Sequence, residues 1–121
     1  MSVVGLGVDA VELDRFRRVL ARTPGVARRL FTDDERAYGA RFRDPTGRLA
    51  ARFAAKEATM KALGHGWPRV SWQDIEIVRG VGRPELRLTG RAAALAGDGR
   101  LAVSLAHDGG VAVAQVILEQ R

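Results

Sequence analysis

The chain contains no cysteine, so it forms no disulfide bond and offers no thiolate as a nucleophile or metal ligand. Aromatic residues are also scarce, at 6%, and no stretch interleaves them with basic residues. A single-stranded nucleic-acid platform, which stacks bases on aromatic rings, is therefore not expected. No apolar stretch approaches the roughly 20 residues of a membrane-spanning helix, and the opening apolar run is too short and glycine-rich for a signal peptide. We expect a protein of the reducing cytoplasm that binds neither nucleic acid nor membrane.

Acidic residues are the second shortage, because 14 Asp and Glu face 20 Lys and Arg, which gives a net charge of +6. A basic chain favours an anionic partner: nucleic acid, a phosphorylated small molecule or an acidic protein. The bases are almost all arginine, and the two lysines, Lys56 and Lys61, lie in one segment. In a chain that otherwise uses arginine, this shared placement draws notice to the segment, although two residues are a small sample.

With 121 residues, of which 46% are hydrophobic, the chain is long enough to bury one core, and we expect a single domain over residues 1–121. Apolar alternation predicts a strand over 3–8, in which Gly5 and Gly7 indicate close approach of another backbone or a ligand. Amphipathic periodicity then predicts a helix over 12–21.

Capping signals predict three further helices. Thr23 and Pro24 suit an N-cap and first turn of a short helix to residue 30, and Thr32 with Glu35 forms a capping box for a helix to about residue 42. The segment 48–63 has no internal Gly or Pro, is rich in alanine and ends before Gly64, so it is the strongest helix prediction.

The second half of the chain reads mainly as hairpins. Strands are predicted around residues 75–78 and 86–88, a short alanine-rich helix over 90–96, and strands over 101–106 and 111–118. The last strand is apolar on both faces, which predicts a central strand covered on both sides. The order indicates an α+β fold in which helices pack on an antiparallel sheet.

Two acids are candidates for chemistry. Asp9 follows an apolar strand just before a helix, where it could also be an N-cap or turn residue. Glu57 lies in the middle of the alanine-rich helix, where the alternative is an exposed ion pair with Lys61 one turn away. If the fold brings the two carboxylates together, they suit Mg²⁺, which prefers oxygen ligands and is often held by one or two carboxylates plus substrate phosphates.

Bases around Glu57 would complete a phosphate site. Lys61 lies one turn beyond it and could neutralise charge on a transferring phosphoryl group. Lys56 and Arg52 could receive other phosphates, or could be ordinary solvated bases.

The chain has two histidines, and their surroundings differ. His107 enters a tight turn and is a candidate donor at the edge of a pocket, whereas His65 lies between glycines and is expected to be merely exposed. Gly64 and Gly66 could let a backbone approach a phosphate, although a lone Gly-x-Gly after a helix is a weak signal.

The first helix carries arginines on one face, with Arg15, Arg18 and Arg22 among them. They could form a solvated surface, or they could grip an acidic partner helix, because guanidinium groups suit carboxylates. This face is the candidate docking surface.

Two motifs carry a family resemblance: Gly5-Leu6-Gly7-Val8-Asp9 and Arg52-Phe53-Ala54-Ala55-Lys56-Glu57-Ala58-x-x-Lys61-Ala62-Leu63-Gly64. They resemble the signature motifs of the 4′-phosphopantetheinyl transferases, and the match extends over essentially the whole chain to the short holo-[acyl-carrier-protein] synthase group. Gly82-Arg83-Pro84 and Ser104-Leu105-Ala106-His107-Asp108 follow in the same order. The second motif is highly specific and the first is moderately so.

The resemblance implies a Mg²⁺-dependent enzyme that moves the 4′-phosphopantetheine arm of coenzyme A onto a serine of apo-acyl carrier protein, in support of fatty acid biosynthesis, with release of adenosine 3′,5′-bisphosphate. By motif position Asp9 and Glu57 would be metal ligands, and Glu57 or a metal-held water would help to take the serine proton. Lys61 would contact phosphate, and Arg52 and His107 would line the coenzyme A pocket. Arg15 and its neighbours would meet the acidic carrier. Short members of the family form homotrimers with sites at subunit interfaces.

Two positions depart from the family pattern. Ala106 replaces the usual serine or threonine before the histidine, which removes one hydroxyl near coenzyme A, and Ala10 is smaller than the usual Ile or Leu. Two rival functions remain on charge alone: a small nucleic-acid-binding module, and a non-catalytic adaptor that binds acidic helices through residues 12–22. Loss of turnover on Glu57→Ala would distinguish the enzyme from both.

Overall fold

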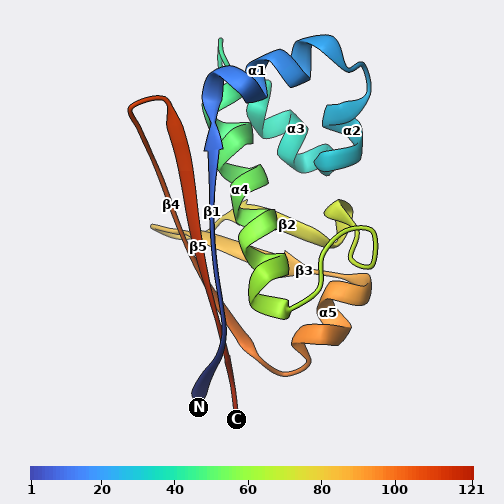
Figure 1. Ribbon diagram of the computed structural model, residues 1–121, viewed down its shortest axis with the longest axis vertical. Helices are drawn as coiled ribbons and strands as arrows, with labels where there is room; N and C mark the ends of the chain where they lie inside the picture. Colours follow the sequence, from blue (N-terminus) through green and yellow to red (C-terminus); the bar gives the residue numbers. More distant parts are fainter.

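The computed structural model describes residues 1–121. Along the chain, one long strand is followed by four helices, a hairpin, a fifth helix and a second hairpin (Figure 1). The elements in chain order are β1 (Ser2–Glu12), α1 (Leu13–Arg22), α2 (Val26–Leu30), α3 (Asp33–Gly39), α4 (Thr46–Leu63), the 3-10 turn η1 (Trp72–Asp74), β2 (Ile75–Arg79), β3 (Pro84–Leu88), α5 (Gly90–Ala96), β4 (Arg100–Asp108) and β5 (Val111–Gln120). The α+β prediction is confirmed.

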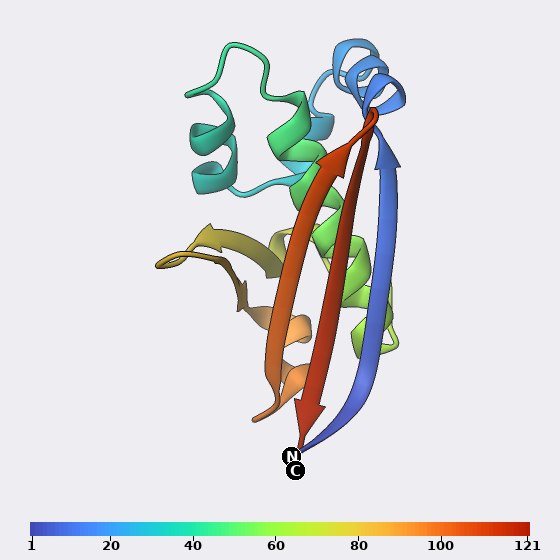
Figure 2. The ribbon, with the colours of Figure 1, turned by 90° about the vertical axis from the view of Figure 1, so that its left-hand side faces the viewer.

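The strands form two antiparallel sheets rather than one. β5 lies between β1 and β4 in a three-stranded sheet, and β2 pairs with β3 in a separate hairpin. Helix α4 runs along one face of the three-stranded sheet, while α1, α2 and α3 gather at one end of the molecule (Figures 1 and 2). None of the helices combines the length and the apolar character that a membrane span requires.

The two glycines of β1 meet the backbone of α4. A Cβ atom added to Gly7 would clash with the carbonyl oxygen of Ala58, and one added to Gly5 would clash with that of Ala62. A two-residue step along a strand covers about 6.6 Å and a four-residue step along a helix about 6 Å, so the contacts repeat in step. The close approach predicted for these glycines is therefore to a helix and not to a ligand.

The helix ends confirm some capping predictions and correct others. Thr32 and Glu35 form the predicted capping box at the start of α3. The helix ends at Gly39 rather than near residue 42, because the amides of Arg41 and Phe42 bond three residues back in tighter turns. α2 begins at Val26, since Gly25 takes a left-handed conformation with φ of 83° and serves as its N-cap in place of Thr23.

The sheet corrects two strand predictions. β1 continues to Glu12 because β5 offers partners as far as Val111, so Asp9 lies within the strand and is no helix N-cap. β5 is central as predicted, but only one of its faces is buried against helices. The opposite face of the sheet has no helix over it (Figure 2), and there Leu6 and Val8 of β1 are 59% and 55% exposed.

Candidate functional site

Asp9 and Glu57 line the same cavity. Asp9 lies two residues beyond Gly7 on the face of β1 that packs on α4, which places it level with the turn of α4 that carries Glu57. The cavity has a volume of about 590 Å³, lies between β1, α1 and α4, and is lined mainly by apolar side chains such as Phe16 and Phe53. The fold thus brings the two predicted acids together.

Lys61 supplies a positive charge at this pair. Its ammonium group donates to the carbonyl oxygen of Val8 at 2.9 Å and lies 3.3 Å from the Asp9 carboxylate. The pKa of Glu57 is raised, first by burial and then by the negative charge of Asp9, while Lys61 opposes the shift. The i,i+4 ion pair between Glu57 and Lys61 considered from the sequence is absent, because Lys61 pairs with Asp9 instead.

The chain has no cluster of three or more metal-binding side chains, so any cation here would rest on two carboxylates. Asp9 and Glu57 fit a hard divalent ion in donor chemistry: both are oxygen donors, they share one cavity, and they repel each other in the metal-free protein.

A second cavity opens on the other side of Glu57 and Lys61. It has a volume of about 610 Å³, and its further lining comes from the end of α4 and the following loop: Met60, Gly64, His65, Gly66, Trp67 and Trp72. Gly64 ends α4 in the left-handed conformation, with φ of 80°. The half-buried His65 lines this cavity, whereas it was expected to be merely exposed.

Lys56 cannot serve as a phosphate ligand, and that prediction is wrong. Its side chain is fully buried, and its ammonium group lies 2.7 Å from Glu35 and donates to the carbonyl oxygens of Trp72 at 2.9 Å and Ile75 at 2.5 Å. Glu35 in turn accepts from the amide of Ile77. The pair therefore ties α4 to α3, η1 and β2 inside the core.

Arg52 and His107 meet at another part of the surface. Together they line a cavity of about 170 Å³, and Arg52 also lines a neighbouring cavity of about 300 Å³ with Tyr38 and Arg79. Arg52 and Glu57 are five residues apart on α4, which rotates them by about 140° around the helix axis. Within one chain the structure therefore separates Arg52 and His107 from Asp9, Glu57 and Lys61.

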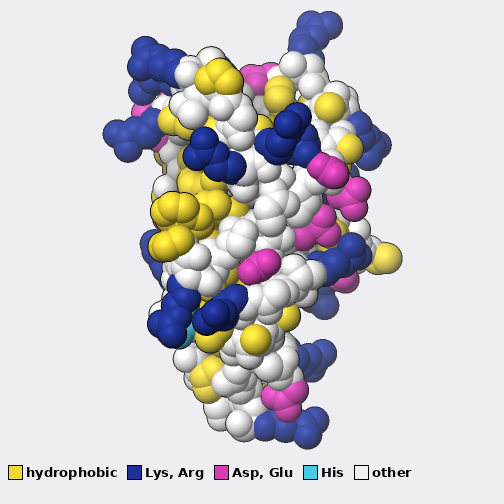
Figure 3. Space-filling model, turned by 90° about the vertical axis from the view of Figure 1, so that its right-hand side faces the viewer, with side chains coloured by type: hydrophobic (Ala, Val, Ile, Leu, Met, Phe, Trp, Pro, Cys, Tyr) yellow, Lys and Arg dark blue, Asp and Glu magenta, His cyan; other side chains and the backbone are white.

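The three arginines of α1 that were predicted to dock a partner form no salt bridge within the chain. Arg15, Arg18 and Arg22 are exposed, and Arg15 also lines the cavity that holds Asp9 and Glu57. On the face seen in Figure 3, Lys and Arg side chains project from the upper part of the molecule, where Figure 1 places α1 and α2.

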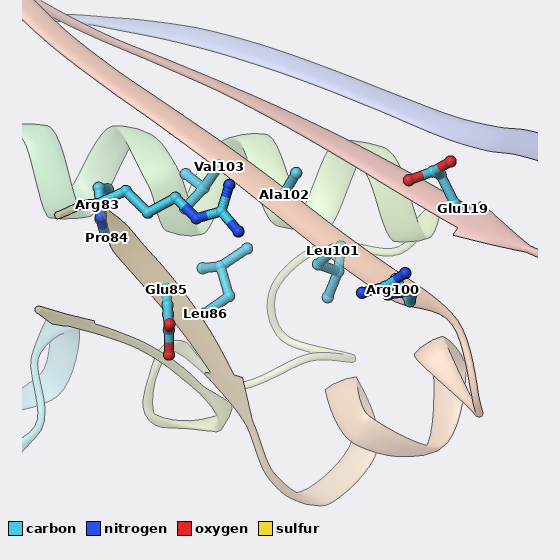
Figure 4. Close-up of a pocket in the computed structure, with 9 residues that line it drawn as sticks. All are labelled: Arg83, Pro84, Glu85, Leu86, Arg100, Leu101, Ala102, Val103 and Glu119. Atoms are coloured by element: carbon cyan, nitrogen blue, oxygen red, sulfur yellow. The ribbon is translucent and has the colours of Figure 1, made fainter. Parts of the chain in front are cut away.

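A further cavity, of about 460 Å³, lies between β3 and β4 and holds none of the predicted site residues. Figure 4 shows the side chain of Arg83 reaching from one end of this cavity over Leu86, and Arg100 at the other end beside Leu101. Its links with the sequence motifs are Arg83 and Pro84, which follow Gly82.

Sequence reasoning did not single out Tyr38, Arg79 or Trp67, although each lines one of these cavities. Trp67 follows Gly66 directly, so the glycine-rich loop was the available signal for it. Tyr38 and Arg79 lie in α3 and at the end of β2, and nothing in their local sequence links them to Arg52.

Comparison with known proteins identifies the class. The sequence profile of the 4′-phosphopantetheinyl transferase superfamily matches residues 5–114, so the chain belongs to that superfamily and is an enzyme of that kind. Among its relatives is the holo-[acyl-carrier-protein] synthase of Frankia casuarinae, 54% identical over 98% of this chain and 99% of the relative. The enzyme of the same name from Streptomyces avermitilis is 49% identical over 98% and 99%.

Solved structures that resemble this chain belong to the same class of enzyme. The complex of ACPS with coenzyme A from Chronobacterium ammoniagenes covers 100% of both chains with a TM-score of 0.87 and 34% identity. A holo-(acyl-carrier-protein) synthase from Bacillus anthracis, in complex with CoA (3′,5′-ADP), covers 98% of both chains with a TM-score of 0.84 and 34% identity. The relatives that cover this chain end to end are thus holo-[acyl-carrier-protein] synthases.

Proposed function

We propose that the chain transfers the 4′-phosphopantetheine group of coenzyme A to a serine hydroxyl of apo-acyl carrier protein and releases adenosine 3′,5′-bisphosphate. The observation that carries this proposal is the cavity shared by Asp9 and Glu57, with Lys61 bonded beside Asp9. Transfer to phosphorus asks a protein mainly for positioning and charge neutralisation, which two acids and a fixed ammonium group provide. The relatives carry the name of this activity, and two of the solved structures contain coenzyme A.

Asp9 and Glu57 would hold one Mg²⁺ ion. Such an ion, when bound, would supply positive charge against the pyrophosphate of coenzyme A and leave its remaining positions for water and substrate oxygen. Glu57 or a metal-held water is the candidate acceptor of the serine proton, as the family motif implies. Lys61, held by the Val8 carbonyl, would face a phosphate.

Arg52 and His107 would contact coenzyme A from a neighbouring copy of the chain. Arg52 and Glu57 line separate cavities on different sides of α4, so one chain does not bring both groups to one ligand. The uncovered sheet face, with Leu6 and Val8 exposed, offers an apolar surface for association, and the family resemblance implies a homotrimer. Light scattering tests this: the wild-type chain should run as a trimer, and Val8→Arg should reduce its mass to that of a monomer.

The acidic carrier would dock on α1. Arg15, Arg18 and Arg22 follow a spacing of three and four residues, so they share one face of the helix. Arg15 lines the cavity that contains the two acids, so a carrier held on this face would present its serine near Glu57. The proposed role is in fatty acid biosynthesis in the cytoplasm.

The direct test mixes the protein with coenzyme A, Mg²⁺ and an apo carrier protein and follows the carrier by mass spectrometry. The carrier should gain the mass of phosphopantetheine, EDTA should abolish the gain and Mg²⁺ should restore it. Glu57→Gln should lose turnover while it keeps its fold by circular dichroism. A folded wild-type protein that leaves the carrier mass unchanged would refute the transfer, and activity insensitive to EDTA would refute the metal role of Asp9 and Glu57.

A further inference from the structure

An aromatic ring lies at the centre of a group of arginines on one side of α4. The guanidinium carbon of Arg52 lies 4.1 Å from the centroid of the Tyr38 ring, and those of Arg41 and Arg79 lie 5.9 Å from it. These arginines come from α4, the loop after α3 and the end of β2. Tyr38 is thus the contact that three separate segments share.

A second aromatic ring extends the cluster. Phe42 packs against Tyr38 in an edge-on arrangement with 5.2 Å between centroids, and Arg48 lies 3.9 Å above the Phe42 ring. The two rings therefore arrange four guanidinium groups without help from a carboxylate, because none of the four arginines forms a salt bridge. Elsewhere in the chain Arg17, Arg36 and Arg87 do have acidic partners.

Arg52 is the most buried of the four arginines, so the positive charges of the others affect it most strongly. It is 5% exposed, and its Nε has no hydrogen-bond partner. Burial lowers the pKa of Arg52, and the positive charge of Arg79 lowers it further, while Tyr38 and Glu35 oppose the shift. A buried cation beside like charges gains free energy when an anion binds.

The cluster opens into the cavity of about 300 Å³ that Tyr38, Arg52, Arg79 and Arg83 line together with Gly80 and Gly82. A guanidinium stacked flat on a ring keeps its N–H edges free, and those edges match the oxygen spacing of a phosphate. Burial would raise the pKa of Tyr38, but a hydrogen bond with Arg48 and the charges of Arg52 and Arg79 lower it overall, so the hydroxyl also faces positive charge.

We propose that Tyr38 is a positioning residue whose ring holds Arg52 and Arg79 as a preformed pair of donors for a phosphate group of coenzyme A. The inference rests on the proposed function for the identity of the ligand. An arginine side chain that a ring already holds in place loses less rotamer entropy when it binds phosphate than a free arginine side chain does. Tyr38 touches no substrate atom in this role and acts through its two neighbours.

Calorimetry with adenosine 3′,5′-bisphosphate as the probe tests the proposal apart from turnover. Tyr38→Leu should weaken binding about tenfold, whereas Tyr38→Phe, which keeps the ring, should stay within threefold of the wild type. In steady-state assays Tyr38→Leu should raise the KM for coenzyme A and leave kcat and the KM for the carrier unchanged. If the phosphate is the 3′ group, the penalty should disappear with 3′-dephospho-coenzyme A; if it is the pyrophosphate, the penalty should remain.

A second pair of variants does not depend on packing near the core. Arg79 and Arg87 are exposed arginines on the two strands of one hairpin, and Arg87 pairs with Glu76 away from the cavity. Arg79→Gln should weaken bisphosphate binding, and Arg87→Gln should leave it unchanged. Equal binding by Tyr38→Leu and the wild type, or equal effects of Arg79→Gln and Arg87→Gln, would overturn the inference alone if the wild type still modifies the carrier. If the folded wild type neither binds the bisphosphate nor modifies the carrier, the proposed function itself would be overturned.

Discussion

Replacing Lys56 by methionine removes the cation from the most deeply buried ion pair of the molecule. Glu35 and Lys56 are both fully buried, and the ammonium group satisfies two carbonyl oxygens as well as the carboxylate. Methionine keeps the length and the apolar stem of lysine but leaves the carboxylate without a counter-ion. Removal of one partner of a buried pair costs about 3–5 kcal/mol. A domain of this size has a total stability of roughly 5–15 kcal/mol, so the loss is a large part of it.

Urea unfolding followed by circular dichroism measures this cost. The midpoint temperature should also fall, by about 10–20 °C, at a few degrees for each kcal/mol. Lys61→Met is the matched control, because the same chemical change at a half-exposed lysine should cost at most about 1 kcal/mol. The double variant Glu35→Met with Lys56→Met should lose less than the sum of the two single variants, since it buries no lone charge. Equal losses for the two lysine variants, or strict additivity in the double variant, would refute this account of the pair.

Three further predictions concern packing, titration and docking. Gly7→Ala should lower the free energy of unfolding by about 3 kcal/mol, because its methyl group meets the Ala58 carbonyl. Gly47→Ala, in open space on α4, should leave that free energy unchanged or raise it by up to about 1 kcal/mol. Urea titrations in which Gly7→Ala is the milder change would contradict the packing. In metal-free protein the raised pKa of Glu57 means that ionised Glu57 costs stability above that pKa, so Glu57→Gln should be more stable than the wild type at pH 7, and the difference should vanish towards pH 4; a constant difference in unfolding free energy would argue against the shift. The pair Arg15→Glu and Arg18→Glu should raise the KM for an acidic carrier at least tenfold at low salt and leave the KM for coenzyme A unchanged; an equal rise in both constants would place the carrier elsewhere.

Much of the fold follows from local sequence signals. The alanine-rich segment without Gly or Pro became α4, and the capping box at Thr32 began α3, because both signals act through neighbours along the chain. Strand lengths were underestimated at residues 3–8 and 101–106, since a strand extends as far as its partner can pair. The prediction that β5 is covered on both faces was also wrong, because an apolar pattern does not say whether another element of the same chain covers it.

The site divides in the same way. The motifs pointed to Asp9, Glu57 and Lys61, and the fold brings these three residues together. Lys56 was misjudged because a lysine in a basic chain reads as solvated, and its partner Glu35 is 21 positions away in sequence. The arrangement of arginines around Tyr38 joins three separate segments, so no local sequence pattern could have predicted it.

The continuity of α4 has a consequence for how such chains can diverge. Because Arg52 and Glu57 lie on one unbroken helix, the angle between their cavities depends on how many peptide units separate them. One alanine inserted between them would turn one group by about 100° relative to the other. A motif search that allows gaps would still find every charged residue in that altered chain, although Arg52 and Glu57 would no longer face their former neighbours. Relatives of this chain must therefore keep the number of residues between these two positions as well as the residues themselves.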